Sequence, residues 1–409
     1  MMKCYVVTGI TGLLGGNFLW EVIKNNITDL DNIRIFCLGR SSDVMPIGQR
    51  INQLVNNGGL DYFANGLSNK ESMAEKVCNA ITPIAIDLKE DKMNLKEEDF
   101  LLLKKNKIDY FVHIAAITDF RNTPNVTAEL EKINYVGTKK IIDLVGSLDN
   151  VENFFYVSSV YSCGMTFGNI KPDYINLNQE FRNPYENIKL KAEIFVRSFC
   201  ENKKMNYKIF RPSTIGGRIF EKPLGHVTKY DVFYEWCVFF LSYKLKIIGK
   251  THDISAMYDK IEIPVRICCN PDSGLNIIPA DYAAKVMYGC VEVEHKCIDY
   301  HLVSTNELNH YEYIPAMIKT LNIDGLSLVS DRPANLNRHE KLYYRTVGSI
   351  YTPYIENPPM LFDYDSMAEV CSNRNLPVNN VDIDQFNIMI EYAKKNNFGI
   401  TPEKKNRKG

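Results

Sequence analysis

The sequence lacks an excess of charge of either sign. Lysine and arginine together number 48 against 49 for aspartate and glutamate, and no block of like charge interrupts the chain before its last few residues. A nucleic-acid-binding protein usually carries a basic patch or stripe, so nucleic acid is not expected as a partner. Internal repeats and low-complexity segments are missing too, and 45% of the residues are apolar, as in a globular protein.

Cysteine pairs of the kind that hold zinc or build a disulfide framework are also missing. The eleven cysteines are scattered singly apart from Cys268 and Cys269, and none belongs to a Cys-x-x-Cys motif. This pattern argues against a metal site and favours a reducing compartment. The N-terminus runs directly into a strand pattern without the apolar region of a signal peptide. We therefore expect a cytoplasmic protein.

The chain has no apolar run of the roughly 20 residues that a membrane-spanning helix needs. Its most apolar stretch, residues 232–245, is shorter and is interrupted by polar side chains. We expect a buried helix or the wall of a substrate pocket there, with a membrane-surface helix as the alternative. Four aromatic residues in this stretch are candidates for lining an apolar pocket: Phe233, Trp236, Phe239 and Phe240.

The first 215 residues alternate short apolar runs with helical patterns, which predicts βαβ units and a parallel sheet. The strand-like runs show no polar alternation, as expected of strands buried on both faces. They cover residues 4–8, 33–38, 83–86, 110–114, 154–157 and 207–210. Helical patterns cover residues 14–24, 125–148 and 185–201. The long connection over residues 39–82 predicts an insertion with additional helix.

A glycine-rich motif, TGITGLLG at residues 8–15, follows the first strand and opens the first helix. Gly9 permits a tight turn, Gly12 lets the backbone approach a pyrophosphate, and Gly15 allows close packing of helix and strand. The N-terminus of the helix then offers unpaired N–H groups to the phosphates. In this strand–loop–helix setting the motif predicts a dinucleotide site and a Rossmann-type doubly wound parallel sheet.

The end of the second strand indicates which dinucleotide is bound. An NAD site normally has an acidic residue there to hold the ribose 2′-hydroxyl, but here Leu38 and Gly39 are followed by Arg40. A guanidinium pairs well with a 2′-phosphate, so NADP(H) is favoured. Asp43 is close enough to keep NAD open. Asp87, after the third strand, either reaches the adenine or is an ordinary turn residue.

We expect the NADP-binding domain to cover residues 1–217, with residues 276–295 returning to it. The pattern changes after Pro212. Residues 218–275 and 296–409 are therefore expected to form a substrate-binding lobe. The predicted fold class is α/β, a doubly wound parallel sheet with a smaller, mixed α/β C-terminal lobe.

Tyr185 and Lys189 stand four residues apart, on one face of a predicted helix. A nearby ammonium favours the phenolate, so we expect the pKa of Tyr185 to fall from its usual value near 10. Tyr185 could then exchange a proton with a carbonyl or alkoxide oxygen while hydride moves to or from a nicotinamide. The preceding strand ends with Ser158 and Ser159, whose hydroxyls either bind the same oxygen or cap a turn.

With these motifs the chain resembles the extended short-chain dehydrogenase/reductase family over roughly residues 3–300. The resemblance also rests on short motifs that follow other strands or open helices: Asp87-Leu88, HIAA at 113–116, NYVGT at 134–138 and RPS at 211–213. It implies three catalytic residues, Tyr185, Lys189 and Ser159. Together with the glycine-rich motif it implies a cofactor-binding set of Thr8, Gly9, Thr11, Gly12, Leu13, Leu14, Gly15, Arg40, Asp87, Leu88, Ala115, Ala116, Lys189, Pro212 and Ser213.

The resemblance also implies individual roles. Ala115 would line the nicotinamide ribose, which Lys189 would also hold, and residues 212–213 would flank the carboxamide. The chain departs from the family at residues 113–114, where an Asn-Ala pair is frequent, and at residues 160–163. Neither departure removes a reacting group.

Within that family the chain resembles the thioester reductase and fatty acyl-CoA reductase branch. The shared features are Leu-Gly-Arg at 38–40, the insertion after it, FRPSTIGG at 210–217, NIIPADY at 276–282 and YHLVS at 300–304. This likeness implies that NADPH reduces an acyl thioester, carried by CoA or a carrier protein, to an aldehyde or alcohol. The chain shows no adenylation region, so the activated acyl group must come from elsewhere. The last hundred residues add nothing to this resemblance.

Other functions use the same cofactor residues. An alcohol or hydroxysteroid dehydrogenase is one alternative, and a nucleotide-sugar epimerase or dehydratase is another. Arg40 and the aromatic stretch at 232–245 weigh against a sugar-nucleotide enzyme, which prefers NAD and a polar substrate. A protein that senses NADP(H) without turnover is the non-enzymatic alternative, but it would need neither Tyr185 nor Ser159. We therefore expect an NAD(P)-dependent oxidoreductase that acts on a small apolar molecule.

Overall fold

The computed structural model describes residues 2–41, 45–66, 70–251, 253–292 and 297–400. Within these residues the main element is a seven-stranded sheet in the order β12-β7-β5-β4-β1-β2-β3, and every pairing in it is parallel. The strands are β1 (Lys3–Thr8), β2 (Ile33–Gly39), β3 (Ile81–Ala85), β4 (Ile108–His113), β5 (Val151–Val157), β7 (Asn206–Pro212) and β12 (Asp299–Leu302). The predicted α/β class with a Rossmann-type sheet is confirmed.

Both faces of the sheet are covered, which explains why the strand sequences are apolar throughout. Successive side chains of a strand point to opposite faces. In β1, Tyr5 and Val7 enter one hydrophobic core, whereas Cys4 and Val6 enter the other. Because neither face meets water, each strand position needs an apolar side chain.

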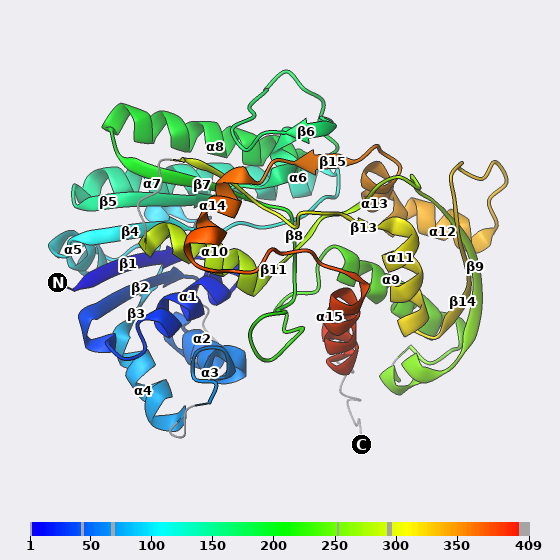
Figure 1. The fold of residues 1–409 in the computed structure, drawn as a ribbon, viewed down its shortest axis with the longest axis horizontal. Coiled ribbons are helices and arrows are strands. Elements are labelled where there is room, and N and C mark those ends of the chain that lie inside the picture. The colour runs from blue at the N-terminus through cyan, green and yellow to red at the C-terminus, as the bar shows by residue number, and fades with distance from the viewer. Residues whose placement is uncertain (1, 42–44, 67–69, 252, 293–296, 401–409) are drawn as a thin grey trace.

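Helices form the outer layers (Figure 1). On one face α1 (Leu13–Asn25) lies against α10 (Ala280–Glu292). The core on the other face includes side chains from α5 (Glu97–Lys105), α7 (Gly137–Leu148) and α8 (Pro184–Lys203). The insertion after β2 forms α2 (Ile47–Leu54), α3 (Leu60–Phe63) and α4 (Lys70–Ala80), the additional helix that the sequence predicts. The helical pattern over 125–148 appears as α6 (Pro124–Leu130), a π-helical turn (Glu131–Val136) and α7.

A second lobe, on the right of Figure 1, has a hydrophobic core of its own. It contains the parallel pair β9 (Ile261–Cys268) and β14 (Ile323–Val329), and the helices α9 (Phe233–Ile247), α11 (His310–Thr320), α12 (Arg338–Arg345), α13 (Val347–Ile355) and α15 (Ile383–Lys395). The apolar stretch at 232–245 is thus a helix buried in this core. Among the described residues, no helix combines the length and the apolarity that crossing a membrane requires.

The boundary of the second lobe differs from the sequence expectation at a strand and a helix that follow residue 296. Residues 296–409 were all expected in the substrate lobe, but β12 pairs with β7 at the edge of the large sheet. Helix α14 (Asp365–Asn373) packs on α10 and β12. A four-residue strand carries too little periodicity to be assigned to a sheet, and its place is set by the free hydrogen-bonding edge of β7. The division into a cofactor-binding and a substrate-binding part stays a prediction.

Asp281, at the start of α10, ties the connection between the lobes to the nucleotide-binding half. It is fully buried, and its carboxylate accepts backbone N–H groups from three successive residues: Ile219 at 3.2 Å, Phe220 at 2.7 Å and Glu221 at 2.7 Å. These residues follow β8 (Thr214–Gly216), whose neighbour β11 (Ile277–Pro279) leads directly into α10. One side chain therefore ties the segment after β8 to the start of α10.

Replacing Asp281 by alanine should destabilise the protein, because three buried N–H groups lose their acceptor. We expect the free energy of unfolding to fall by about 3 kcal/mol, measured by urea denaturation. The control is Asp272→Ala, in an exposed turn, which should change it by less than about 0.5 kcal/mol. Equal, small effects of both substitutions would show that the Asp281 contacts contribute little.

Candidate active site

A cavity of about 440 Å³ lies at the carboxyl ends of the sheet strands, within the range usual for small-molecule and cofactor sites. It lies at β1 and β4, the neighbouring strands between which the strand order reverses, the place where open α/β sheets bind ligands. Of the catalytic and cofactor-binding residues predicted from the sequence, all except Thr8 line it. The fold thus brings together residues from positions 9 to 213.

The glycine-rich loop forms a cradle of bare backbone. Gly9 has φ +76°, and a Cβ there would lie 2.6 Å from the backbone nitrogen of Ala115. A Cβ on Gly15 would collide with the carbonyl oxygen of Gly9, so β1, the loop and α1 can pack this closely only with glycine. Gly12 is the N-cap of α1, and no side chain caps that end. Free N–H groups at the mouth of the cavity fit a pyrophosphate.

Two arginines line the cavity next to the end of β2. Arg40 follows β2, and its carbonyl oxygen accepts a hydrogen bond from Arg50 Nη1 at 2.9 Å. Arg50 lies on α2 in the insertion, and burial together with the neighbouring Arg40 charge lowers its pKa. Asp43, which kept NAD open in the sequence, lies outside the described residues. Asp87 Oδ1 accepts the backbone N–H of Lys89 at 2.9 Å, which is the turn role, while the residue also lines the cavity.

Thr8 lies behind the cavity wall and supports it. Its Oγ1 accepts the backbone N–H groups of Ile114 at 3.1 Å and Ala115 at 3.2 Å. The hydroxyl also lies 2.8 Å from Nδ1 of His113. The end of β1 therefore holds the loop after β4, which carries Ala115 and Ala116 into the cavity. This is a structural role, different from the direct cofactor contact expected for Thr8.

His113, one of the departures from the family pattern, continues this contact across the sheet. Its Nε2 lies 3.1 Å from Thr138 Oγ1, and the Thr138 hydroxyl donates to the carbonyl of Asn134 at 2.7 Å. Since the two threonine oxygens already have these partners, Thr8 donates to Nδ1 and Nε2–H donates to Thr138. The imidazole is neutral, because burial, followed by the nearby Lys189 charge, lowers the pKa of His113 to about 3.

Lys189 is directed at Tyr156 and the end of β5 rather than at Tyr185. Its ammonium donates to the carbonyl of Val157 at 2.7 Å and to the hydroxyl of Tyr156 at 3.2 Å, and lies 4.7 Å from the centre of the Tyr156 ring. Burial lowers the pKa of Lys189 to about 7, against the opposing effect of Glu193 one helical turn away. The ammonium is thus held in place by groups on β5.

The pKa of Tyr185 changes in the opposite direction to the sequence expectation. Burial raises it, and hydrogen bonds with Ser159 and Thr118 only partly offset this effect. The expected lowering by Lys189 does not occur because the Lys189 ammonium bonds elsewhere. Tyr185 is therefore a neutral phenol at physiological pH, able to donate a proton but not poised as a phenolate.

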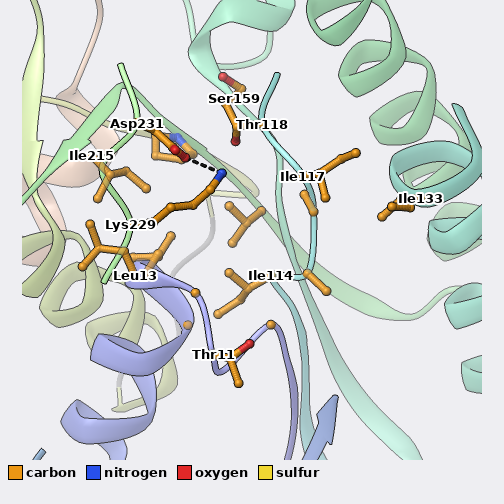
Figure 2. A pocket seen from close by; sticks show the side chains of 18 of the residues that line it. Thr11, Leu13, Ile114, Ile117, Thr118, Ile133, Ser159, Ile215, Lys229 and Asp231 are labelled. Carbon is orange, nitrogen blue, oxygen red and sulfur yellow. Dashed lines mark ion pairs between the residues drawn. The ribbon is translucent and has the colours of Figure 1, made fainter. Parts of the chain in front are cut away.

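Ser159 both caps a turn and faces the cavity, so the two expectations for this strand end are compatible. Its Oγ accepts the backbone N–H of Tyr161 at 3.2 Å, which leaves the hydroxyl proton to donate. Figure 2 shows Ser159 beside Thr118 at one end of the cavity, with Thr11 and Leu13 at the other. The sequence prediction missed Thr118. Its signal was its place in the loop that follows β4, at the ligand-binding edge of the sheet.

The inner end of the cavity fits a nicotinamide. Ser213 is buried and lines the cavity, and its Oγ has no hydrogen-bond partner within the part of the chain that the structure describes. A buried hydroxyl without a partner is costly, and a carboxamide would supply one. Across from it, the loop before α9 adds an ion pair between Lys229 and Asp231 at 2.6 Å (Figure 2), which the sequence did not indicate.

Aromatic side chains form the wall beyond the catalytic hydroxyls. The ring of Phe120 lies 5.3 Å from that of Tyr185 and 5.5 Å from that of Tyr354. Of the four aromatic residues proposed from the sequence, Trp236 and Phe233 line a side cavity here. Phe239 and Phe240 line neither cavity, and Phe240 packs on Tyr343 in the lobe core. The expectation was wrong for these two: Phe239 lies on a less buried side of α9, whereas Phe240 shares the face of Trp236 but lies one turn further along the helix, beyond the cavity.

A model of the male sterility protein family matches residues 7–287, well over half of the sequence. The chain belongs to this family. Its members are NAD(P)-dependent oxidoreductases of the extended short-chain dehydrogenase/reductase type. A Drosophila melanogaster protein assigned as a fatty acyl-CoA reductase is 25% identical over 156 residues. These cover 38% of this chain but only 28% of the fly protein, so the match spans less than a third of that relative's length.

Solved structures of the family's fold cover almost the whole chain. The terminal R domain from the myxalamid PKS-NRPS biosynthetic pathway superposes with a TM-score of 0.68 at 19% identity, covering 98% of this chain and 93% of that domain. A UDP-glucuronic acid 4-epimerase from Bacillus cereus, in complex with NAD, gives a TM-score of 0.57 at 14% identity, covering 98% and 99%. At these identities the likeness establishes the fold, and with the family it establishes a nicotinamide cofactor.

Cofactor affinity should depend on pH through Lys189. The ammonium is protonated below its pKa of about 7 and neutral above it. We propose that it holds the cofactor ribose, in which case these hydrogen bonds weaken as the pH rises. We expect the Kd of NADPH to increase about tenfold between pH 6 and pH 9, the equivalent of about one charged hydrogen bond. Fluorescence titration of NADPH measures this change.

Two variants on α8 separate this effect from general ones. Lys189→Met should bind NADPH weakly and with no step near pH 7. Lys191→Met, which removes an exposed lysine on the same helix, should behave as the wild type. A wild-type Kd that is constant from pH 6 to pH 9 would rule out a titrating Lys189 at the site.

Proposed function

We propose that this protein is an NADPH-dependent reductase that converts an acyl thioester, carried by CoA or a carrier protein, to an aldehyde or alcohol. The observation that carries the proposal is the position of Tyr185. Its neutral phenol is flanked by the hydroxyls of Ser159 and Thr118, where the cofactor cavity meets an aromatic side cavity. Such a site binds one carbonyl oxygen and an apolar substituent.

NADPH, when bound, supplies hydride to the carbonyl carbon. The residues that would hold it are the glycine loop for the pyrophosphate, Lys189 for the nicotinamide ribose and Ser213 for the carboxamide. The Lys189 ammonium is already oriented by its hydrogen bonds to the Tyr156 hydroxyl and the Val157 carbonyl.

The chain's own hydroxyls act on the carbonyl oxygen. Ser159 and Tyr185 each donate a hydrogen bond to it, and both bonds strengthen as the carbon becomes tetrahedral and charge develops on the oxygen. Tyr185 then gives up its proton, which its raised pKa makes available only to a strongly basic alkoxide. The hemithioacetal that results loses the thiol and leaves an aldehyde.

The preference for NADP(H) is part of this proposal. Arg40 and Arg50 lie together at the adenosine end, and two guanidinium groups complement a 2′-phosphate better than two ribose hydroxyls. No acidic side chain follows β2 directly, where an NAD site would have one.

The aromatic wall favours an acyl thioester over the other substrates of this fold. A sugar nucleotide needs hydrogen-bonding partners for its hydroxyls, whereas Phe120, Tyr354 and Trp236 offer ring faces. The fly protein with the matching segment is assigned as a fatty acyl-CoA reductase, which agrees with an apolar acyl substrate. An alcohol dehydrogenase of an apolar substrate is the second candidate, because the same wall and hydroxyls would serve it.

Tyr185→Phe tests the catalytic assignment, because it removes one hydroxyl and leaves the ring packed on Phe120. We expect turnover of an acyl-CoA and of an aldehyde to fall by roughly 10²–10⁴-fold, the usual worth of a general acid. NADPH affinity and the thermal midpoint should stay unchanged. Tyr258→Phe, which alters an exposed tyrosine, is the matched control. Rates near wild type on both substrates would remove the main support for the enzyme assignment.

Arg40→Ala tests the cofactor preference. The Kd of NADPH should rise by the equivalent of about 1–3 kcal/mol, as for a charge-assisted hydrogen bond, while that of NADH should change little. Arg34→Ala is the control, because Arg34 lies on β2, the strand that precedes Arg40, but bonds to Asn106 away from the cavity. Isothermal titration with both cofactors decides the point, and equal weakening of NADH and NADPH would contradict it.

A further inference from the structure

A second, small cavity opens beside the catalytic tyrosine. It has a volume of about 30 Å³ and shares Phe120, Tyr161 and Val232 with the large cavity. Phe120 contacts Tyr185 by ring-edge packing. The small cavity therefore begins where the substituent of a bound carbonyl would project, so it is the inner end of the substrate site.

Aromatic and aliphatic groups make up almost the whole lining. Trp236 from α9 and Tyr351 and Ile355 from α13 are part of it. Two of the four lining tyrosines donate to carboxylates, Tyr351 to Glu235 at 2.6 Å and Tyr354 to Glu186 at 2.7 Å. The other two hydroxyls are also bonded, that of Tyr161 to Thr214 at 2.8 Å and that of Tyr313 to His310 at 3.2 Å. Ring faces are left to contact a ligand, which must itself be apolar to gain from burial there.

The walls are held by packing that limits expansion. Trp236, Tyr351 and Ile355 are only 2%, 7% and 3% exposed. Trp236 packs edge-on against Tyr351, with ring centres 5.5 Å apart, and on its other side lies near Tyr343 in the lobe core. Enlarging the cavity would displace core side chains, which costs stability. Its depth is therefore set by these residues.

We propose that this cavity limits the substrate to short, unbranched apolar acyl groups of about four or five carbons. This inference rests on the proposed reductase function. A volume of about 30 Å³ holds roughly two or three groups of the size of a water molecule or a methylene. The carbonyl carbon and its neighbour lie in the large cavity beside Tyr185, so only the next few carbons enter the small one. A long alkyl chain finds its path closed by Trp236 and Tyr351.

The test is the chain-length profile of NADPH oxidation with acyl-CoA substrates of 2, 4, 6, 8, 12 and 16 carbons. For the wild type, kcat/KM should be highest at about four carbons and at least about tenfold lower at twelve. Trp236→Ala should move the optimum several carbons towards longer chains, with the change mainly in KM. A wild type that reduces the twelve- or sixteen-carbon substrate as well as the four-carbon one overturns the proposal.

Two further variants serve as a control and as a second test. Phe239→Ala, on the same helix but lining neither cavity, should keep the wild-type profile. Ile355→Ala enlarges the cavity from α13 and should also favour longer chains, which serves if Trp236→Ala does not fold. The same profile for the wild type, Ile355→Ala and Phe239→Ala would show that the cavity does not select the chain.

A binding measurement separates this proposal from the thioester chemistry. The chain has two tryptophans, and Trp20 packs beside Phe63, away from both cavities. In a Trp20→Phe background with NADP⁺ present, butanal and pentanal should change the emission of Trp236, whereas dodecanal should not. This result with no turnover of any thioester would reject the reductase proposal and retain the cavity assignment. No response to any aldehyde, or an equal response to dodecanal, would reject the cavity assignment.

Discussion

A chain of buried hydrogen bonds joins the cofactor loop to the catalytic helix, and the site depends on it. Thr8 at the end of β1 bonds to His113 at the end of β4, which bonds to Thr138 on α7. Thr138 in turn contacts Tyr156, the partner of Lys189. Each group is buried and has a defined donor or acceptor role, so displacing one leaves its neighbours without a partner. The positions of the glycine loop, the loop after β4 and Lys189 are thereby coupled.

The electrostatics of the site follow from this burial. Lys189 sits in low-dielectric surroundings with Glu193 as its nearest opposing charge, and Arg211 and Arg197 bind that carboxylate in turn. The pKa of Glu193 is held at about 2 by these arginines against the effect of burial. Because Glu193 is already paired with these two arginines, it stabilises the charge of the Lys189 ammonium only in part. Tyr185, further from this group, stays a phenol, which suits proton donation to an oxyanion.

Residues of the second lobe that are far apart in the sequence complete the site. Helices α9 and α13 lie more than a hundred residues apart in sequence, yet Trp236 and Tyr351 meet in one wall. Asp281 anchors the segment after β8 to α10, and the loop that carries Lys229 lines the same cavity as Ser159 and Tyr185. In the proposed function, the sheet binds the cofactor and the lobe selects the apolar group.

What the sequence alone determined is local. Six strands, the glycine loop and the four-residue spacing of Tyr185 and Lys189 were readable because backbone geometry imposes them within a few residues. The α/β class and the nucleotide half followed from their succession.

Contacts between distant segments were decided only in three dimensions. Thr118 and Arg50 reach the site through tertiary contacts, which leave no periodic pattern in the sequence. The short strand β12 joins the sheet because the edge of β7 offers free hydrogen-bonding groups. The pKa of Tyr185 was predicted in the wrong direction. Helical spacing places the backbone of Lys189 on the same face as Tyr185, but packing against β5 determines the position of the Lys189 ammonium. On α9, likewise, Trp236 lines the cavity, whereas Phe240, one turn further along the same face, packs on Tyr343 in the core of the lobe.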